Sequence, residues 1–168
     1  RRSVVCMGTA YILSPATDEA ASSLATYLPT VLAVRAPEMA VRAGAAIVAV
    51  RIVALAASAQ EHPAFFVLGA TPDGRDLAGM LSALLEIGVL VNATGLTWDV
   101  AAVGVPAGPR VEMQPFGGRV LTSSGFTGER GIILLRPNTV TAEPLPAPGS
   151  VEERAPGDLI ELPAVRVV

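Results

Sequence analysis

The sequence of 168 residues has no lysine, one cysteine and one histidine. A single thiol, Cys6, excludes an internal disulfide and a metal site built from cysteines. Because Cys6 lies in an apolar run, we expect a small buried side chain and not a reactive thiol. His62 has no assigned acid or nucleophile partner, and no Gly-x-Ser-x-Gly segment is present. The sequence therefore argues against a hydrolase.

Charge is also scarce. Charged residues make up 16% of the chain, and the formal net charge is −3 at pH 7. The sequence has no basic run, which argues against nucleic acid as a ligand. The longest apolar region, 36–59, is interrupted by Arg42 and Arg51, whereas a membrane-spanning helix needs about 20 apolar residues. We expect a soluble, cytoplasmic protein with no membrane span and no metal site.

Apolar residues are abundant by contrast. They form 51% of the chain, and the mean hydropathy is +0.53. The segment 37–60 is predicted to be a helix that is apolar on most of its faces, so a sheet can cover only part of it. Soluble monomers rarely expose large apolar patches. We therefore expect this protein to bind another protein or a second copy of itself.

Strand and helix signals alternate along the first two-thirds of the chain. The apolar run 64–69 is continuous, which is typical of a central parallel strand. A helix is predicted to begin at Ser14 and Pro15, and another is predicted to end at Gly88 in a left-handed cap. The predicted strands are 2–12, 30–34, 64–69 and 89–97, and the predicted helices are 14–28, 37–60 and 74–86.

The pattern changes at Trp98. Up to Arg136 we predict only short β runs and no helix, because Gly- and Pro-rich turns separate them. The fold class expected is α/β, a parallel Rossmann-like sheet (of the adenine nucleotide alpha hydrolase type) with helices on both faces and an antiparallel β extension. We assign residues 1–140 to this domain. Residues 141–168 are predicted to be a Pro-rich linker or tail with a final strand, 159–168.

The loop GATPDGRD, residues 69–76, follows a predicted strand directly. Ligands of such sheets bind outside the carboxyl ends of the strands, so the position suits a ligand. The loop is neither a G-x-G-x-x-G segment nor a P-loop. The candidate residues for a nucleotide or interface loop are Thr71, Asp73, Gly74, Arg75 and Asp76.

A structural role for these residues is also open. Thr71 or Asp73 can accept hydrogen bonds from the free amides of the helix start. We place Asp76 in the first helical turn, where its charge would contribute about 0.3–1 kcal/mol. Arg75 is predicted to pair with the neighbouring aspartates. In this interpretation the loop only turns a strand into a helix.

The same stretch resembles a known family. VLGATPDGRDLAGMLSALL is similar to the strand, loop and helix in the amino-terminal domain of the electron transfer flavoprotein alpha subunit. Three later segments resemble that domain in the same order, and Asn138 replaces a glycine usual in the family. The matching residues are Leu68-Gly69-Ala70-Thr71 and Gly74-Arg75-Asp76-Leu77-Ala78, followed by VNATGL, PFGGRVLTSS and IILLRPNTV.

The resemblance implies a scaffold domain of an electron carrier and not an enzyme. Members of that family begin with one further strand and helix, and they continue into a second domain that binds FAD; we find neither part in this sequence. We therefore expect no cofactor in this chain alone, FAD in the complete complex, and a beta-like subunit as the partner, or a homo-oligomer.

Two further expectations concern the site. The candidate interface comprises Phe116, Gly117 and Gly118. The two glycines permit a hairpin turn or a close approach of two chains, and Phe116 is predicted to pack and not to stack on a cofactor. The alternative function is a stand-alone adenine-nucleotide-binding α/β module that holds AMP or a similar ligand at the loop 69–76.

Overall fold

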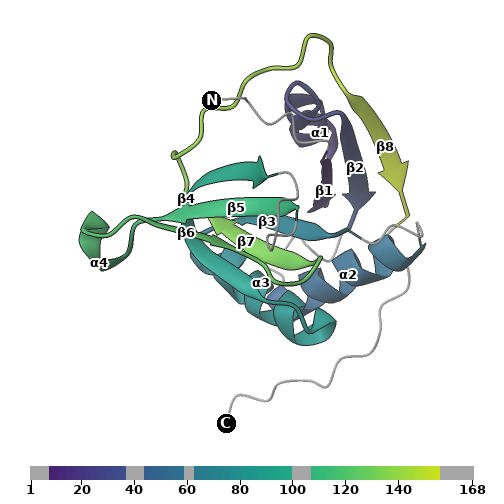
Figure 1. Ribbon diagram of the computed structural model, residues 1–168. Coiled ribbons are helices and arrows are strands. Elements are labelled where there is room, and N and C mark those ends of the chain that lie inside the picture. The colour runs from purple at the N-terminus through teal and green to yellow at the C-terminus, as the bar shows by residue number, and fades with distance from the viewer. Residues whose placement is uncertain (1–7, 37–43, 59–62, 100–106, 156–168) are drawn as a thin grey trace. The chain divides into compact units, whose positions relative to one another are not determined.

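A computed structural model describes residues 8–36, 44–58, 63–99 and 107–155. These residues form two compact units (Figure 1). The first, here called the parallel-sheet unit, draws on Cys6–Glu61 and Ala142–Val168. The described residues of the second, the mixed-sheet unit, lie within His62–Thr141. The expected α/β fold is confirmed, but its strands form two sheets.

The parallel-sheet unit contains three strands in the order β1-β2-β8, all parallel. Helix α1 contacts all three strands. The core between them is built from small side chains, chiefly alanines of α1 and residues of β2. The elements are β1 (Thr9–Ser14), α1 (Asp18–Ala25), β2 (Thr30–Arg35), α2 (Ala45–Ser58) and β8 (Ser150–Arg154).

The third strand of this unit comes from the far end of the chain. Figure 1 shows β8 alongside β2. Backbone bonds fix the approach, because the amide of Gly149 donates to the carbonyl of Ala25 at 2.7 Å and that of Ser150 donates to Pro29 at 2.9 Å. A Cβ on Gly149 would collide with the carbonyl oxygen of Leu28 and lie 2.6 Å from that of Pro29. Glycine is therefore required where the tail meets the turn before β2.

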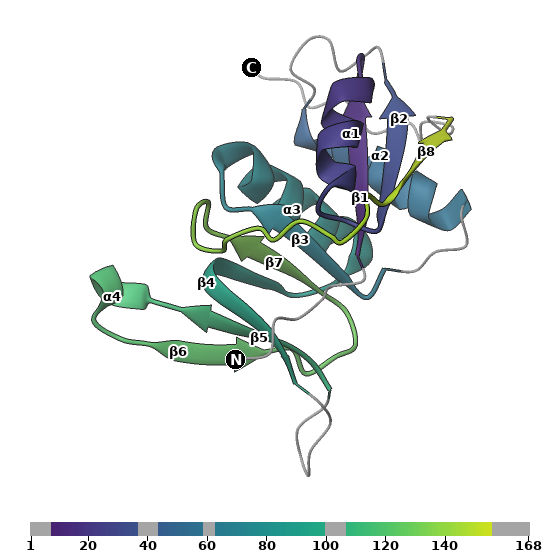
Figure 2. The same cartoon turned by 90° about the horizontal axis from the view of Figure 1, so that it is seen from above.

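The mixed-sheet unit contains five strands in the order β3-β7-β4-β5-β6. The first three are mutually parallel, and β4, β5 and β6 continue as an antiparallel meander. Helix α3 contacts β3 and β7 (Figure 2). The elements are β3 (Phe65–Gly69), α3 (Pro72–Leu85), β4 (Val89–Asp99), β5 (Gly108–Met113), α4 (Pro115–Gly118), β6 (Thr122–Gly125) and β7 (Gly131–Leu135).

Strand β7 carries the core of this unit. Its residues Ile132, Ile133 and Leu134 are buried. Ile133 packs with Ala93 of β4 and Val111 of β5. Because side chains alternate between the faces of a strand, Ile132 and Leu134 point to the opposite face. Burial on both faces explains why β7 is a continuous apolar run.

Several sequence-based boundaries were wrong for identifiable reasons. No helix begins at Ser14, because Ser14 is still paired with Arg35 in the β1–β2 ladder; α1 begins at Asp18, and Thr17 precedes it. The left-handed residue after α3 is Glu86 (φ 54°), not Gly88. The carbonyl of Gly88 instead accepts from the amide of Ile132 at 2.9 Å, so Gly88 already bonds to β7 directly before β4 begins.

One further prediction about the sheet was wrong. β3 is parallel to β7, as expected, but it forms one edge of the described sheet and not its centre. Phe66 is buried, but Val67 is 48% exposed, so the apolar run does not mark a strand that is buried on both faces. Between Trp98 and Arg136 we predicted β runs and turns without a helix. The four residues of α4 form a single turn in which Phe116 and Gly117 are left-handed, so the described part of this region contains no regular α-helix.

The strands 30–34 and 89–97 and the helix 74–86 are confirmed as β2, β4 and α3 within a few residues. Other predictions lie wholly or partly outside the described residues. They concern Cys6, His62, the beginnings of the strand 2–12 and of the helix 37–60, the part of the β run beyond Asp99, and the final strand 159–168.

Candidate functional site

One edge of the mixed sheet collects the segments singled out in the sequence. Gly69 at the end of β3 is level with Leu135 at the end of β7, and Leu135 is level with Ala93 of β4. Two bonds close this edge, from the Ala70 amide to the Leu135 carbonyl (2.7 Å) and from the Arg136 amide to the Ala93 carbonyl (2.8 Å). We call residues 69–76, 92–94 and 136–138 the carboxyl edge.

The loop of the carboxyl edge is an ordinary and complete helix start. Thr71 is the N-cap residue, with φ −83° and ψ 167°, and its hydroxyl oxygen accepts from the amide of Gly74 at 3.1 Å. Pro72 occupies the first helical turn, as its fixed φ favours. The amide of Arg75 donates to the carbonyl of Thr71 at 3.0 Å. The predicted capping role of Thr71 is confirmed.

Gly74 is required by packing. A Cβ built on Gly74 would collide with the carbonyl oxygen of Gly69 and lie 3.2 Å from the hydroxyl oxygen of Thr71. Gly69 itself would tolerate a side chain, since its nearest neighbour would be a methyl group at 3.7 Å. The helix start is therefore pressed against the end of β3, and the backbone leaves no open cradle between them.

The charged residues of the loop lie differently from the prediction. The first turn of α3 contains Asp73, whereas Asp76 falls just beyond that turn and is exposed. The guanidinium of Arg75 donates to the side-chain oxygen of Asn92 at 3.0 Å, and no ion pair of Arg75 with an aspartate is found among the described residues. Asn92 is left-handed (φ 58°) and lies in a bulge of β4, which directs its side chain to this partner.

The connection between β5 and β6 leaves the sheet at the same edge. Met113 pairs with Ala93 on one side and with Thr122 on the other. Residues 114–121, which we call the hairpin tip, join the two strands. The turn predicted at Gly117 and Gly118 is confirmed, and both glycines have positive φ, 67° and 84°.

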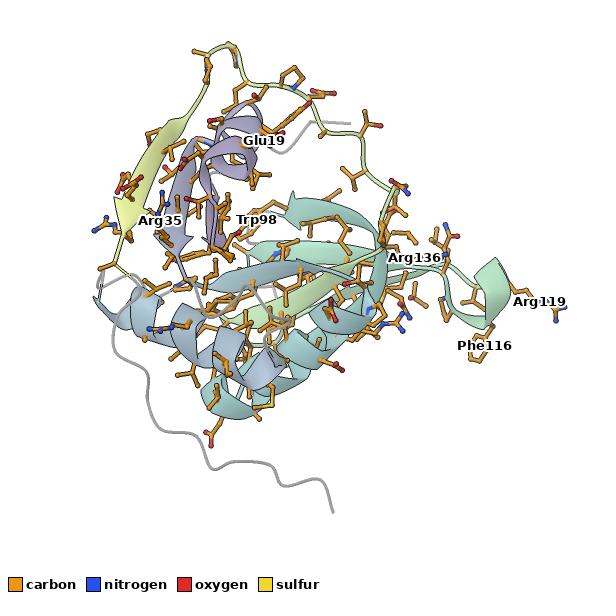
Figure 3. The ribbon with its side chains drawn as sticks, turned by 180° about the vertical axis from the view of Figure 1, so that it is seen from behind. Glu19, Arg35, Trp98, Phe116, Arg119 and Arg136 are labelled. Atoms are coloured by element: carbon orange, nitrogen blue, oxygen red, sulfur yellow. The ribbon has the colours of Figure 1, made fainter. Side chains whose placement is uncertain are left out.

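The prediction that Phe116 packs against the protein is wrong. Its side chain is 79% exposed, and its backbone is left-handed at φ 53°. Figure 3 shows Phe116 and Arg119 pointing away from the sheet, while Arg136 lies nearer to it. The structure thus brings the hairpin tip to the same edge as the loop, but it leaves the aromatic ring in solvent.

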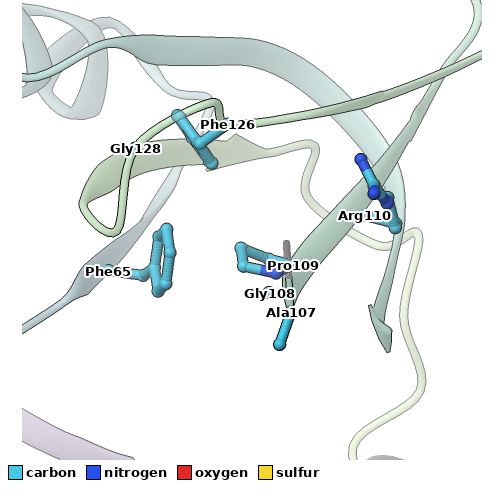
Figure 4. Close-up of a pocket in the computed structure, with 7 residues that line it drawn as sticks. All are labelled: Phe65, Ala107, Gly108, Pro109, Arg110, Phe126 and Gly128. Carbon is cyan, nitrogen blue, oxygen red and sulfur yellow. The ribbon is translucent and has the colours of Figure 1, made fainter. Parts of the chain in front are cut away.

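A pocket lies elsewhere in the mixed-sheet unit. Phe65 and Phe126 line it, with ring centroids 5.5 Å apart, and Trp98 meets Phe65 edge-on at 5.5 Å. The pocket is lined by Phe65, Ala107, Gly108, Pro109, Arg110, Phe126 and Gly128 (Figure 4). Its volume of about 10 Å³ leaves room for about one water molecule. Phe65 begins β3, so this pocket is at the strand's other end from the loop.

Comparison with known families decides the affiliation. Residues 3–159 match the electron transfer flavoprotein domain. The chain belongs to the electron transfer flavoprotein domain family. Members of this family are electron carriers that bind FAD in their complexes. The match does not separate the alpha type of subunit from the beta type. No curated protein matches the chain.

At the carboxyl edge of this electron transfer flavoprotein domain, several of the amides that a dinucleotide would need are already engaged. A dinucleotide needs free amides and a close approach of backbone at a helix start. The amides of Ala70, Gly74 and Arg75 already donate within the protein, and Gly74 lies against Gly69. The described residues also contain no cluster of three or more acidic, histidine or cysteine side chains that could hold a metal. No described helix is long and apolar enough to cross a membrane.

Sequence reasoning missed Asn92 and Asn138 as parts of this edge. Asn138 is left-handed at φ 62°. Asparagine is one of the few residues that adopt this conformation readily, which explains why it can replace the glycine usual at this position in the resembling family. The only sign in the sequence was that both residues are asparagines. Knowledge of the turns in which they lie would have been needed to tell them from other asparagines.

Proposed function

We propose that this chain is an alpha-type amino-terminal domain that serves as a scaffold and pairs with a beta-like subunit in a flavin-based electron carrier. One observation carries the proposal. The segments that resemble the alpha type lie at one edge of the mixed sheet, joined by the bonds from Arg75 to Asn92, Ala70 to Leu135 and Arg136 to Ala93. Residues far apart in sequence thus build one local structure.

The scaffold role follows from what these contacts do. The polar groups of the loop hold a strand, a helix start and a bulge together, and they leave few donors for a ligand. In a flavin-based carrier the flavin supplies the redox chemistry, while the protein supplies position and electrostatics. The proposal assigns positioning to this chain and flavin binding to other parts of the complex.

A second candidate is the adenine-nucleotide-binding module, which one observation favours. The loop does lie at the carboxyl ends of parallel strands, where nucleotides bind in such folds, and Arg75 and Arg136 are exposed there. The occupied amides weigh against it. A rise in melting temperature with micromolar AMP or ADP would support this module over the scaffold.

The test of the scaffold proposal is reconstitution. The purified chain is mixed with the beta-like subunit from the same organism, and association is measured by gel filtration with light scattering. We expect a stable complex, and we expect the chain alone to be colourless after incubation with FAD and gel filtration. Stoichiometric flavin retained by the chain alone, or no association with the beta-like subunit, would overturn the proposal.

A further inference from the structure

The hairpin tip exposes an unusual set of side chains. The whole chain contains only four phenylalanines, two tyrosines and one tryptophan. Phe116 is nevertheless 79% exposed, Leu121 is 68% exposed and Val120 is 43% exposed. Single exposed apolar residues are common, but three within six residues at the end of a projection form a patch. Such patches mark interaction sites.

The backbone of the tip supports this interpretation. Phe116 is left-handed, and so are Gly117 and Gly118 after it. A bulky residue in this conformation is strained, whereas glycine adopts it freely. Because the ring is largely exposed, burial of the ring does not offset the strain. A strained residue that its own fold does not require is grounds for a hypothesis of function.

The charge of the tip limits what can bind it. Residues 114–121 include Arg119 and no acidic residue. Arg119 is exposed, and its guanidinium makes no hydrogen bond or ion pair with the rest of the described chain. The complementary surface is therefore apolar and carries a carboxylate. Two tips facing each other would bring two Arg119 side chains together, and lipid surfaces are recognised by clusters of basic residues, not by a single one.

We infer that the hairpin tip is a docking arm that inserts Phe116 into an apolar pocket of the partner subunit, with an acidic side chain at the rim facing Arg119. This inference rests on the proposed pairing with a beta-like subunit and specifies its surface. An aromatic anchor in a desolvated pocket, with an arginine beside it, is the usual composition of an energetic centre in a protein interface.

The experiment compares two glycine substitutions. Phe116→Gly removes the ring and relieves the left-handed strain, so the fold should be as stable as the parent or more so. Glu86→Gly is the matched control, because Glu86 has the same left-handed backbone conformation (φ 54°) and lies at the C-terminal end of α3. The probe is the purified beta-like subunit, and its Kd for each variant is measured by isothermal titration.

We expect Phe116→Gly to weaken binding about 30-fold, as for a central anchor, and Glu86→Gly to change it by no more than about twofold. Phe116→Asn also accepts the left-handed backbone and should lose binding equally. Arg119→Glu should weaken binding further than Arg119→Gln, because it opposes the acidic rim.

Other outcomes overturn the inference. Equal Kd values for the parent and Phe116→Gly would show that the subunits pair through another surface, leaving the proposed function intact. Failure of the parent to bind the beta-like subunit would remove the proposed function itself, and the docking arm with it. Self-association of the parent, or its binding to anionic vesicles, abolished by Phe116→Gly would assign the tip to a second copy or to a lipid surface.

Discussion

The two units of the molecule are assembled in opposite ways. The strands of the mixed-sheet unit come from one continuous stretch of chain, and its core contains isoleucine, valine and phenylalanine side chains. The parallel-sheet unit combines β1, α1 and β2 with a strand more than a hundred residues later, over a core of mostly alanine and valine. Smaller side chains bury less apolar area and contribute less stabilisation. The parallel-sheet unit should therefore depend more on backbone contacts.

The strongest test of this difference is Gly149→Val. The new side chain would collide with the carbonyl of Leu28 and displace β8 from β2. We expect a loss of about 3 kcal/mol or more in the stability of the parallel-sheet unit, because a backbone collision cannot be relieved by side-chain motion. Hydrogen exchange should become faster in β2 while β7 keeps its protection. Gly128→Ala is the control, since nothing lies within 4 Å of a Cβ there. Equal exchange in both variants would contradict the prediction.

The reciprocal test is Gly74→Ala, which acts on the mixed-sheet unit. A Cβ would strike the carbonyl oxygen of Gly69, so we expect a loss of about 2–3 kcal/mol by denaturant unfolding. Gly79→Ala on the same helix has open space and should instead stabilise by about 0.5–1 kcal/mol. If both substitutions shift the midpoint of denaturant unfolding in the same direction, α3 does not approach β3 as closely as described.

A smaller effect is expected from Thr71→Ala. This change removes the oxygen that accepts from the Gly74 amide, and loss of such a cap costs about 1 kcal/mol. Thr71→Ser keeps the oxygen and serves as the control. Thermal unfolding that does not distinguish the two variants would show that the cap contributes nothing.

The smallest effect is expected from Asp76→Ala. The sequence suggested about 0.3–1 kcal/mol for this carboxylate, on the assumption that it lies in the first turn. In the structure Asp76 lies beyond that turn and is exposed, and its carboxylate forms no hydrogen bond or ion pair within the described residues. We now expect a change within about 0.5 kcal/mol. A loss of 1 kcal/mol or more in chemical denaturation would restore the original interpretation.

The sequence predicted what depends on local pattern. The strands 30–34 and 89–97, the helix after Thr71 and the cap itself were predicted because their signals span neighbouring residues. The pairing of β8 with β2 could not be predicted in this way. SVEER is an exposed polar segment, and its place depends on a turn formed around Pro29, far away in sequence.

In the candidate site, too, local features were predicted and contacts between distant residues were not. Thr71 behaves as local capping chemistry predicts, whereas Gly74 is required by its close approach to Gly69 and not by a left-handed backbone. The predicted partner of Arg75 was wrong. Arg75 bonds to Asn92, which comes within reach only through a bulge that shifts the register of β4 against β7. The exposure of Phe116 was also missed, since an aromatic residue between polar and glycine neighbours gives no sign of which way the turn projects.

The position of β8 has a consequence for the synthesis of the chain. Ser150 and its partner Pro29 are separated by 121 residues. At translation rates of about 5–20 residues per second, β2 emerges about 6–24 s before the strand that covers its edge. During that interval the edge of β2 offers unpaired amides and carbonyls that can pair with the wrong strand. The mixed-sheet unit, whose strands come from one continuous stretch of chain, can fold before the parallel-sheet unit is complete.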